Sequence, residues 1–206
     1  MAKYNPGLFG SVSGKIGNVV GSSWNGVCYL KSLAAKVKNP KTAAQVAVRD
    51  LMKLTTQGLR PFLVAIRAGY KAVKGLSSWS IAISRNRSVI VDAAAGGSNW
   101  TFDVTRVELT NGVESFDVDV VKNREGGYDA SWTPVDGESK LDGGEVYVVV
   151  YNAKTKRAET FRSEMSAGAM TVSAAGLMTG SGDEIHVYAF AASAKGSSAT
   201  RHYSFD

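Results

Sequence analysis

Residues 7–38 read GLFGSVSGKIGNVVGSSWNGVCYLKSLAAKVK, and the rest of the chain reads as attachments to this stretch. It contains no acidic residue, and glycines punctuate it at positions 7, 10, 14, 17, 21 and 26. The short apolar pieces between the glycines predict two strands, about 14–22 and 26–32. The pair Asn25-Gly26 favours a tight hairpin turn between them, because both residues tolerate a positive φ.

Alternation along the two predicted strands assigns side chains to faces. It puts Ile16 and Val20 on one face of the first strand. On the second strand, the residues that share a face are Val27, Tyr29 and Lys31. Residues 1–13, with a turn signal at 5–7, are expected to be irregular.

A phosphate-binding loop is the alternative interpretation of so many glycines, and the spacing excludes it. The Walker motif needs four residues between its glycines and a serine or threonine after its lysine. Here three residues separate Gly10 from Gly14, and Ile16 follows Lys15. A GxGxxG fingerprint is also absent from this stretch. The stretch is therefore interpreted as a docking or packing element, in which Gly21→Val or Gly26→Val should impair folding or assembly.

The middle of the chain predicts basic helices. Thr42-Ala-Ala-Gln45 fits a capping box, so a first helix is expected at about 42–57, ending at Gly58 as its C-cap. Its apolar stripe at helical spacing comprises Ala44, Val48, Leu51 and Leu54 or Thr55. A second helix is expected from Pro61 to Gly75, with a buried side of Phe62, Leu63, Ile66, Tyr70 and Val73. A third helix is expected to begin near Ser77 or Ser78.

After the small, flexible segment 93–98, AAAGGS, the chain reads as β-structure. Short strands are expected at about 101–109, 113–121, 128–132, 145–151, 157–163, 169–172, 184–191 and 200–205. Residues 145–151 are apolar on both faces, as in a central strand. The predicted class is α+β: a Gly-rich hairpin and basic helices at 1–92, a linker at 93–98, and an immunoglobulin- or fibronectin-III-like β-sandwich at 99–206.

The net charge of +6 conceals a division between the two parts of the chain. Residues 1–91 carry 14 lysines and arginines against one acid, Asp50, whereas residues 92–206 carry 10 against 17 acids. A cationic helix face is usually only a solvated face. The near-absence of acidic residues over about ninety positions, however, leaves more positive charge than a solvated face requires. The basic part is expected to face an acidic surface, which is nucleic acid, an acidic protein, or the acidic part of a neighbouring copy.

No catalytic constellation emerges from the sequence, and no enzyme activity, cofactor or metal is expected. Cys28 is the only cysteine, which excludes an intrachain disulfide, and its apolar neighbours predict a small buried side chain. His186 and His202 alone make a weak zinc proposal. Asp117 and Asp119 share one face of a strand and are expected to be solvent-exposed. The fragments at 136–138 and 142–145 lack the spacing of a calcium loop and are interpreted as turns.

The runs GLFGSVSGKIGNVVGSSWNGVCYLKS and KVKNPKTAAQVAVRDLMKL, followed by LRPFL and GYK, resemble an uncharacterised family of Bacteroidota and their phages. That family shares the patterns GxxSGKxGxVVGxxWKGxxYxR and NPxTxxQxxQRxxF. The matching positions are Ser13, Gly14, Lys15, Gly17, Val19, Val20, Gly21, Trp24, Gly26, Tyr29, Asn39, Pro40, Thr42, Gln45 and Arg49. Asn25 and Lys31 replace the usual lysine and arginine. The resemblance covers about residues 7–75 and implies a phage or mobile-element context, with no known activity or ligand.

These observations predict a non-enzymatic structural component of a phage particle or similar assembly, in contact with other structural proteins or copies of itself. The residues expected to dock are Lys15, Trp24, Tyr29, Lys31, Lys36, Lys38, Lys41 and Arg49. The alternative is a nucleic-acid-binding protein that uses the basic part, and a surface adhesin with glycan-binding loops is a third possibility. No membrane insertion and no signal peptide are expected, so the location is the virion if a phage encodes the chain, and otherwise the cytoplasm.

Overall fold

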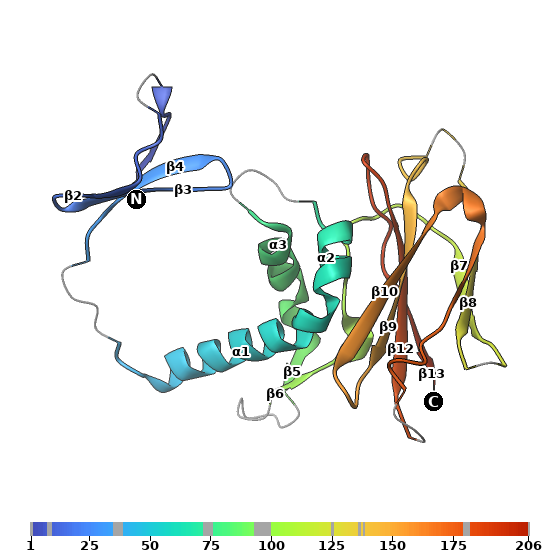
Figure 1. Cartoon of the computed structure of the whole chain (residues 1–206). Helices are drawn as coiled ribbons and strands as arrows, with labels where there is room; N and C mark the ends of the chain where they lie inside the picture. Colours follow the sequence, from blue (N-terminus) through green and yellow to red (C-terminus); the bar gives the residue numbers. More distant parts are fainter. Residues whose placement is uncertain are drawn as a thin grey trace.

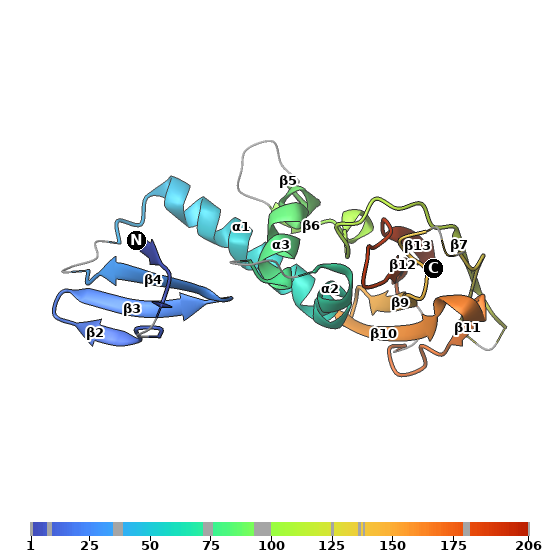
Figure 2. The same ribbon diagram turned by 90° about the horizontal axis from the view of Figure 1, so that it is seen from above.

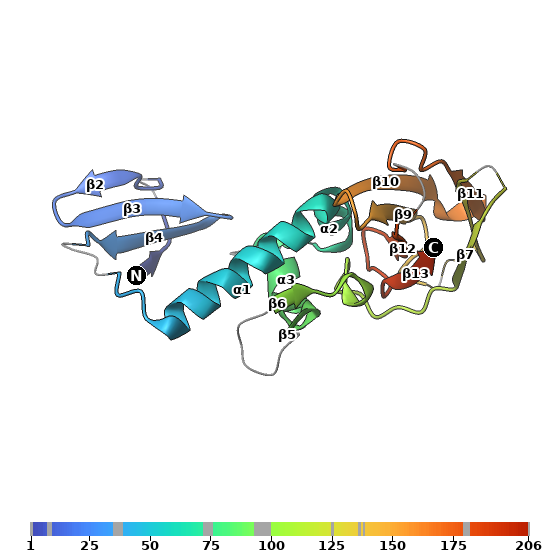
Figure 3. The same cartoon turned by 90° about the horizontal axis from the view of Figure 1, so that it is seen from below.

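The computed structural model describes residues 2–7, 10–34, 39–71, 76–92, 100–124, 126–135, 137, 139–178 and 182–205. The fold is α+β, and its named sheets are antiparallel. A small N-terminal sheet and a projecting helix, α1, lie at one end of the molecule, and α1 leads into a body of helices and β-sheets (Figure 1). The N-terminal sheet and the strands β7 and β8 lie at opposite ends of the molecule in all three views (Figures 1, 2 and 3).

The N-terminal sheet has the strand order β1-β4-β3-β2. Its strands are β1 (Ala2–Tyr4), β2 (Gly14–Ile16), β3 (Val19–Trp24) and β4 (Val27–Ser32). β3 and β4 pair across Asn25 and Gly26, whose φ values of 45° and 74° are those of a tight hairpin turn.

Two details of this sheet differ from the prediction. The expected strand 14–22 is two strands, because Gly17 adopts a φ of 56° and the chain reverses there. As a result Ile16 pairs with Val19, and the predicted shared face of Ile16 and Val20 is wrong. The expected irregular N-terminus is also wrong in part, since β1 pairs with β4 at the edge of the sheet.

The helices begin where local capping predicts. α1 (Ala43–Leu59) begins after Thr42, whose Oγ1 accepts a hydrogen bond from the Gln45 N–H at 3.4 Å. The helix does not end at Gly58. A Cβ at Gly58 would lie 2.3 Å from the Phe102 ring, so this glycine permits close packing instead of capping the helix.

The chain continues through the 3₁₀ turn η2 (Arg60–Phe62) into α2 (Leu63–Gly69). α2 is shorter than the predicted second helix, whose last residues, 72–75, lie outside the described part. α3 (Ser78–Arg85) begins after Ser77, whose Oγ accepts a hydrogen bond from the Ser80 N–H at 3.2 Å. The 3₁₀ turn η3 (Asn86–Val89) follows α3.

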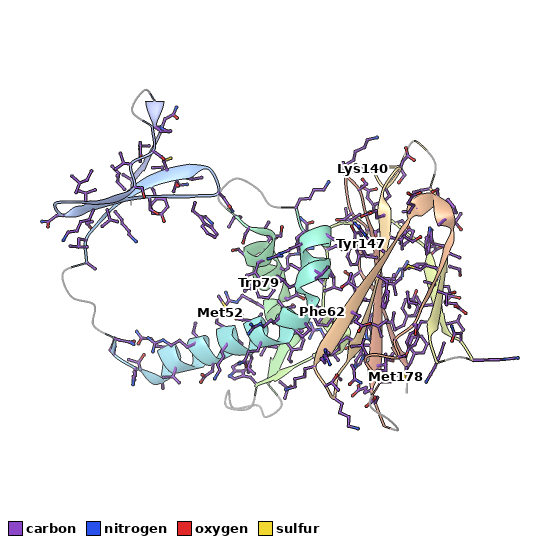
Figure 4. The ribbon with its side chains drawn as sticks, in the orientation of Figure 1. Met52, Phe62, Trp79, Lys140, Tyr147 and Met178 are labelled. Carbon is purple, nitrogen blue, oxygen red and sulfur yellow. The ribbon has the colours of Figure 1, made fainter. Side chains whose placement is uncertain are left out.

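The first half of α1 contacts little of the body. Only Thr55 and Leu59 of this helix are buried, and both lie near its end. The predicted apolar stripe is therefore wrong at Val48, which is 61% exposed, and Met52 beside it is 52% exposed. The start of the helix projects from the body and leaves apolar side chains in solvent (Figure 4).

The β-rich part forms two larger sheets and one small one. β5 (Ile90–Asp92) pairs with β6 (Trp100–Phe102). The four-stranded sheet has the order β10-β9-β12-β13, and the three-stranded sheet has the order β11-β8-β7. The strands are β7 (Val118–Lys122), β8 (Tyr128–Trp132), β9 (Glu145–Asn152), β10 (Arg157–Glu164), β11 (Ala169–Val172), β12 (Ile185–Ala192) and β13 (Arg201–Phe205).

The four-stranded sheet is covered on both faces, which explains its apolar central strands. Val146, Val148 and Val150 of β9 pack in one hydrophobic cluster with Tyr128 and Trp132 of the three-stranded sheet. The alternate residues of β9 face a second cluster, which contains side chains of the helices. That second cluster includes Leu59, Phe62, Ala65, Ile66, Tyr70, Val149, Tyr151, Tyr188 and Phe190. The body therefore has three layers: helices, four strands and three strands (Figure 1).

The chain from β6 to β7 contains less β-structure than predicted. Of the expected strand 113–121, only residues 118–121 lie in a strand, β7. Residues 101–109 form only the end of β6, the 3₁₀ turn η4 (Val104–Arg106) and an irregular stretch. Side chains from other elements bind this backbone in place of a neighbouring strand. The Asn86 Oδ1 accepts the Glu108 N–H at 2.8 Å, and Tyr188 donates to the Val104 carbonyl at 2.6 Å. Buried polar backbone is thus satisfied without a β-ladder.

The predicted linker 93–98 lies outside the described residues, and the division of the chain there stays a prediction. The second hydrophobic cluster contains residues from both sides of this segment. The helices of the basic part therefore pack directly on the strands of the acidic part.

Candidate interaction surface

Cross-strand pairing gathers basic and aromatic side chains on one face of the N-terminal sheet. Lys15 of β2 pairs with Val20, Val20 pairs with Lys31, and Lys3 of β1 pairs with Tyr29. Directly paired residues share a face, and so do residues two apart along a strand. The resulting lysine face comprises Lys3, Lys15, Val20, Ser22, Trp24, Val27, Tyr29 and Lys31.

The lysine face is open to solvent. Lys3, Lys15 and Lys31 are exposed, Trp24 is 56% exposed, and Tyr29 is half-buried. Among the described residues, none of these three lysines forms an ion pair. The face combines positive charge with aromatic surface, which suits an anionic partner better than a purely apolar one.

The opposite face of the sheet is partly covered by the chain itself. Residues 10–13 cross it at Gly21, where a Cβ would lie 2.5 Å from the Val12 carbonyl oxygen. The Tyr4 hydroxyl accepts a hydrogen bond from the Val12 N–H and holds this crossing in place. Cys28, on the same face, is buried as predicted. The lysine face is therefore the side of the sheet opposite to this crossing.

The Gly21→Val variant should release residues 10–13 from the sheet, because its side chain would overlap the Val12 backbone. We expect amide exchange in residues 10–34 to accelerate by at least about tenfold, measured by hydrogen–deuterium exchange mass spectrometry. Ser23→Val is the matched control, because Ser23 is exposed on the same strand and should tolerate a β-branched residue. Equal exchange in both variants would contradict the prediction.

The structure brings four of the predicted docking residues together and separates the others. Lys15, Trp24, Tyr29 and Lys31 lie on the lysine face. Lys41 and Arg49 are exposed near the start of α1, where Arg49 donates a hydrogen bond to the Asn39 side chain. Lys36 and Lys38 lie outside the described residues. Lys3 joins the face through the pairing of β1 with β4, which the sequence did not predict.

Residues 11–203 match the model of a family of unknown function (DUF6266). The chain belongs to this family. The match extends from the N-terminal sheet to β13, so membership concerns the whole arrangement and is not confined to the Gly-rich stretch. The predicted resemblance to an uncharacterised family is confirmed at that level, while its host range and N-terminal pattern stay predictions. A search of curated proteins finds no match to the chain.

The two histidines meet on the four-stranded sheet, which their sequence separation did not indicate. His186 on β12 is buried, and its Nδ1 lies 3.0 Å from the Nε2 of His202 on β13. The rings stack at a centroid distance of 5.2 Å, and the ring of Tyr188 lies 5.1 Å from His202. His186 and His202 occupy diagonal positions on one face, because Tyr188 pairs with His202 and His186 with Ser204.

The surroundings of this histidine pair shift the pKa of His202. Within the described ranges there is no group of three or more His, Cys, Asp or Glu that could hold a metal ion. Glu184 Oε1 lies 3.2 Å from His186 Nε2, so the pair has one carboxylate beside it. Burial lowers the pKa of His202, and the neighbouring His186 lowers it further.

Stability should fall when the pH drops below about 6.5, the ordinary pKa of histidine. The lowered pKa of His202 means that the unfolded chain binds more protons than the folded protein in this range. Stability is thus complete near neutral pH and is lost on acidification. We expect the Tm to drop between pH 7 and pH 5, and His202→Gln to reduce that drop. A drop of the same size in the variant would contradict this assignment.

Asp117 and Asp119, which the sequence predicts to be solvent-exposed, are exposed in the structure. Asp117 is 97% exposed immediately before β7, and Asp119 is exposed on it. Asp142 lies in the turn before β9, and Glu145 is the first residue of β9, whereas Asp136 and Glu138 lie outside the described residues. Tyr147 donates a hydrogen bond to the Glu145 carboxylate. Burial, and to a smaller extent this bond, raises the pKa of Tyr147 to about 12.

None of the described helices is long and apolar enough to cross a bilayer.

Proposed function

We propose that the chain is a non-enzymatic structural component of a phage particle or similar assembly, in which the lysine face docks and the β-sandwich makes protein contacts. The observation that carries the proposal is the lack of a core under the N-terminal sheet. Among the described residues between positions 2 and 34, only Gly21 and Cys28 are buried. A sheet with so little buried apolar surface is marginal alone and is stabilised by contact with a partner.

The projecting start of α1 supports the same proposal. Val46, Val48 and Met52 expose apolar side chains along a helix that touches the body only near its end. Exposed apolar surface on a projecting element is typical of an interaction site. The projecting helix and the N-terminal sheet lie at one end of the molecule (Figure 1). That end is therefore the docking end, and the three-layer body is the part that supports it.

The strand order supports the fibronectin type III variant of the sandwich. In chain order, β7, β8 and β11 form one sheet and β9, β10, β12 and β13 the other. Counted from β7, the fourth strand of the sandwich is β10, and it lies in the same sheet as β9. In constant-type immunoglobulin domains the fourth strand lies in the other sheet, with the first and second strands. Such sandwiches serve as spacers and adhesion modules in many proteins, and this analogy of fold is consistent with a structural role.

Fractionation of particles from producing cells tests the proposal. The chain should co-sediment with particles in a density gradient and be detected there by mass spectrometry. The triple variant K3E/K15E/K31E should leave the particle fraction, whereas the control Arg87→Glu, an exposed change on η3 of the body, should remain in it. Absence of the wild-type chain from every particle and envelope fraction would refute a structural role.

Nucleic-acid binding is the second candidate function, and the composition of the lysine face supports it. Three lysines beside Trp24 and Tyr29 combine phosphate attraction with stacking surface, as in proteins that bind single strands. Such binding should weaken steeply as salt increases. A gel shift with single-stranded DNA at low salt tests it, and the absence of a shift that depends on the three lysines would exclude this function.

A further inference from the structure

The three-stranded sheet has an open face of opposite charge to the lysine face. Its inner residues, such as Tyr128 and Trp132, pack in the first hydrophobic cluster. The alternate residues therefore point outward, and register places them together. This aspartate face comprises Asp119, Val121, Asp129, Ser131, Ala169 and Thr171, all of which are exposed.

The aspartate face is acidic over adjoining strands. Asp119 lies on β7 and Asp129 on the neighbouring β8, and no lysine or arginine is among the six members of the face. Thr171 donates a hydrogen bond to Asp129 at 2.7 Å, which orients the carboxylate without neutralising it. Asp117 extends the face beyond β7, with Arg201 at 3.7 Å from it. A shallow hollow lined by Asp117, Asp119, Ser131 and Thr133 lies at this end.

The lysine face and the aspartate face are complementary: both are open sheet faces, their charges are opposite, and each carries an exposed apolar side chain. Both are the open sides of small antiparallel sheets, which pack face to face about 10 Å apart in proteins. Three lysines on one face oppose three aspartates on or beside the other. Val121, which is 57% exposed on the aspartate face, gives Trp24 of the lysine face an apolar counterpart.

One molecule does not bring its own two faces together in this structure. The N-terminal sheet lies at one end, and β7 and β8 lie at the other, with α1 and the body between them (Figures 1, 2 and 3). We propose that the lysine face of one copy docks on the aspartate face of the next copy. This inference rests on the proposed structural function and names the partner as a second copy of the chain.

The proposed contact is head-to-tail. It joins two different surfaces, so each copy keeps one free lysine face or one free aspartate face after the first contact forms. Repetition of such a contact gives a closed ring or an open filament. The same surfaces would thus build an array from a single kind of chain.

Sedimentation velocity on the full-length protein tests the proposal. We expect the wild-type chain to associate as its concentration rises from micromolar to millimolar, and to dissociate in 1 M NaCl, where the Debye length is about 3 Å. A wild-type chain that stays monomeric throughout would overturn the proposal. Association that is unchanged in 1 M NaCl would also overturn it, since charge pairing would then contribute little.

Charge exchange between the faces makes the test specific. K3E/K15E/K31E gives a chain with two negative faces, and D117K/D119K/D129K gives one with two positive faces. Each alone should associate at least about tenfold more weakly than the wild type, because like charges would meet. An equimolar mixture should regain association, because each lysine-face site then meets an opposite charge on the other variant. The control R87E/E159K, which changes exposed charges on η3 and β10, should associate as the wild type does.

Further outcomes distinguish a failure of self-docking from a failure of the proposed structural role. Recovery in the mixture requires both variants to be folded, and far-ultraviolet circular dichroism of each variant checks this independently. Folded variants that fail to associate when mixed would overturn head-to-tail docking. If the chain is monomeric yet K3E/K15E/K31E leaves the particle fraction, the structural role holds and the partner is another protein. If the three lysines bind DNA and support no self-association, self-docking is wrong.

Discussion

Replacing Phe62 with alanine is expected to destabilise the protein by about 3–5 kcal/mol, as for other fully buried aromatic residues. Phe62 has no exposed surface and lies in the layer between the helices and the four-stranded sheet (Figure 4). Its ring centroid is 4.9 Å from that of Tyr151 and 5.3 Å from that of Tyr188. The substitution removes both aromatic contacts and leaves a cavity at the centre of the second cluster.

Urea denaturation followed by circular dichroism measures this loss. Val64→Ala is the matched control, because Val64 is two residues away on α2 and 63% exposed, so its loss should stay within about 0.5 kcal/mol. The experiment also reports on how the layers depend on each other. If the helices and the sandwich unfold together, Phe62→Ala lowers one shared transition. A loss below about 1 kcal/mol would show that the helices do not stabilise the sheet.

Replacing Asn86 with alanine is expected to cost about 2–4 kcal/mol. Asn86 is completely buried after α3, and its side chain makes three hydrogen bonds to backbone. Its Nδ2 donates to the carbonyls of Ala82 and Glu108, each at 2.9 Å, and its Oδ1 accepts the Glu108 N–H at 2.8 Å. Alanine would leave the Glu108 N–H without this acceptor, which is why the expected loss exceeds that of one ordinary hydrogen bond.

Thermal unfolding and hydrogen exchange together measure the Asn86→Ala effect. The amides of residues 107–110 should lose protection, since this side chain binds that segment to α3. Arg87→Ala is the control, because Arg87 is the exposed neighbour in the same 3₁₀ turn. Unchanged protection at Glu108 in the Asn86 variant would mean that other contacts hold the segment, such as the Tyr70 hydroxyl, which donates to the Glu108 carbonyl at 2.9 Å.

Only part of the lysine face could be predicted from the sequence. Alternation along one strand predicted that Val27, Tyr29 and Lys31 share a face, because that relation is local. Lys15 joined them only through the pairing of β2 with β3. Lys3 joined them through β1, whose three residues carry too little pattern to predict a strand. The meeting of His186 and His202 likewise depends on the register of β12 and β13.

Local rules and tertiary contacts explain different glycines and different backbone segments. Gly26 was predicted correctly as a turn residue, because positive φ is a local requirement. Gly58 was predicted wrongly as a helix end, because its reason is the Phe102 ring, which is distant in sequence. Gly112 is another tertiary case, since a Cβ there would lie 1.8 Å from the Ser197 carbonyl oxygen. The segment after β6 alternates like a strand, but it is bound by side chains from η3 and β12.

Residue patterns were sufficient to predict the helix starts at Thr42 and Ser77, the strands from β8 to β13, and the opposite charges of the two parts of the chain. These features follow from capping, alternation and composition, which act within a few residues. The covering of the four-stranded sheet by the helices, and the placement of the lysine and aspartate faces at opposite ends, depend on tertiary packing. Packing and strand register join residues far apart in the chain, and no local pattern specifies which face meets which.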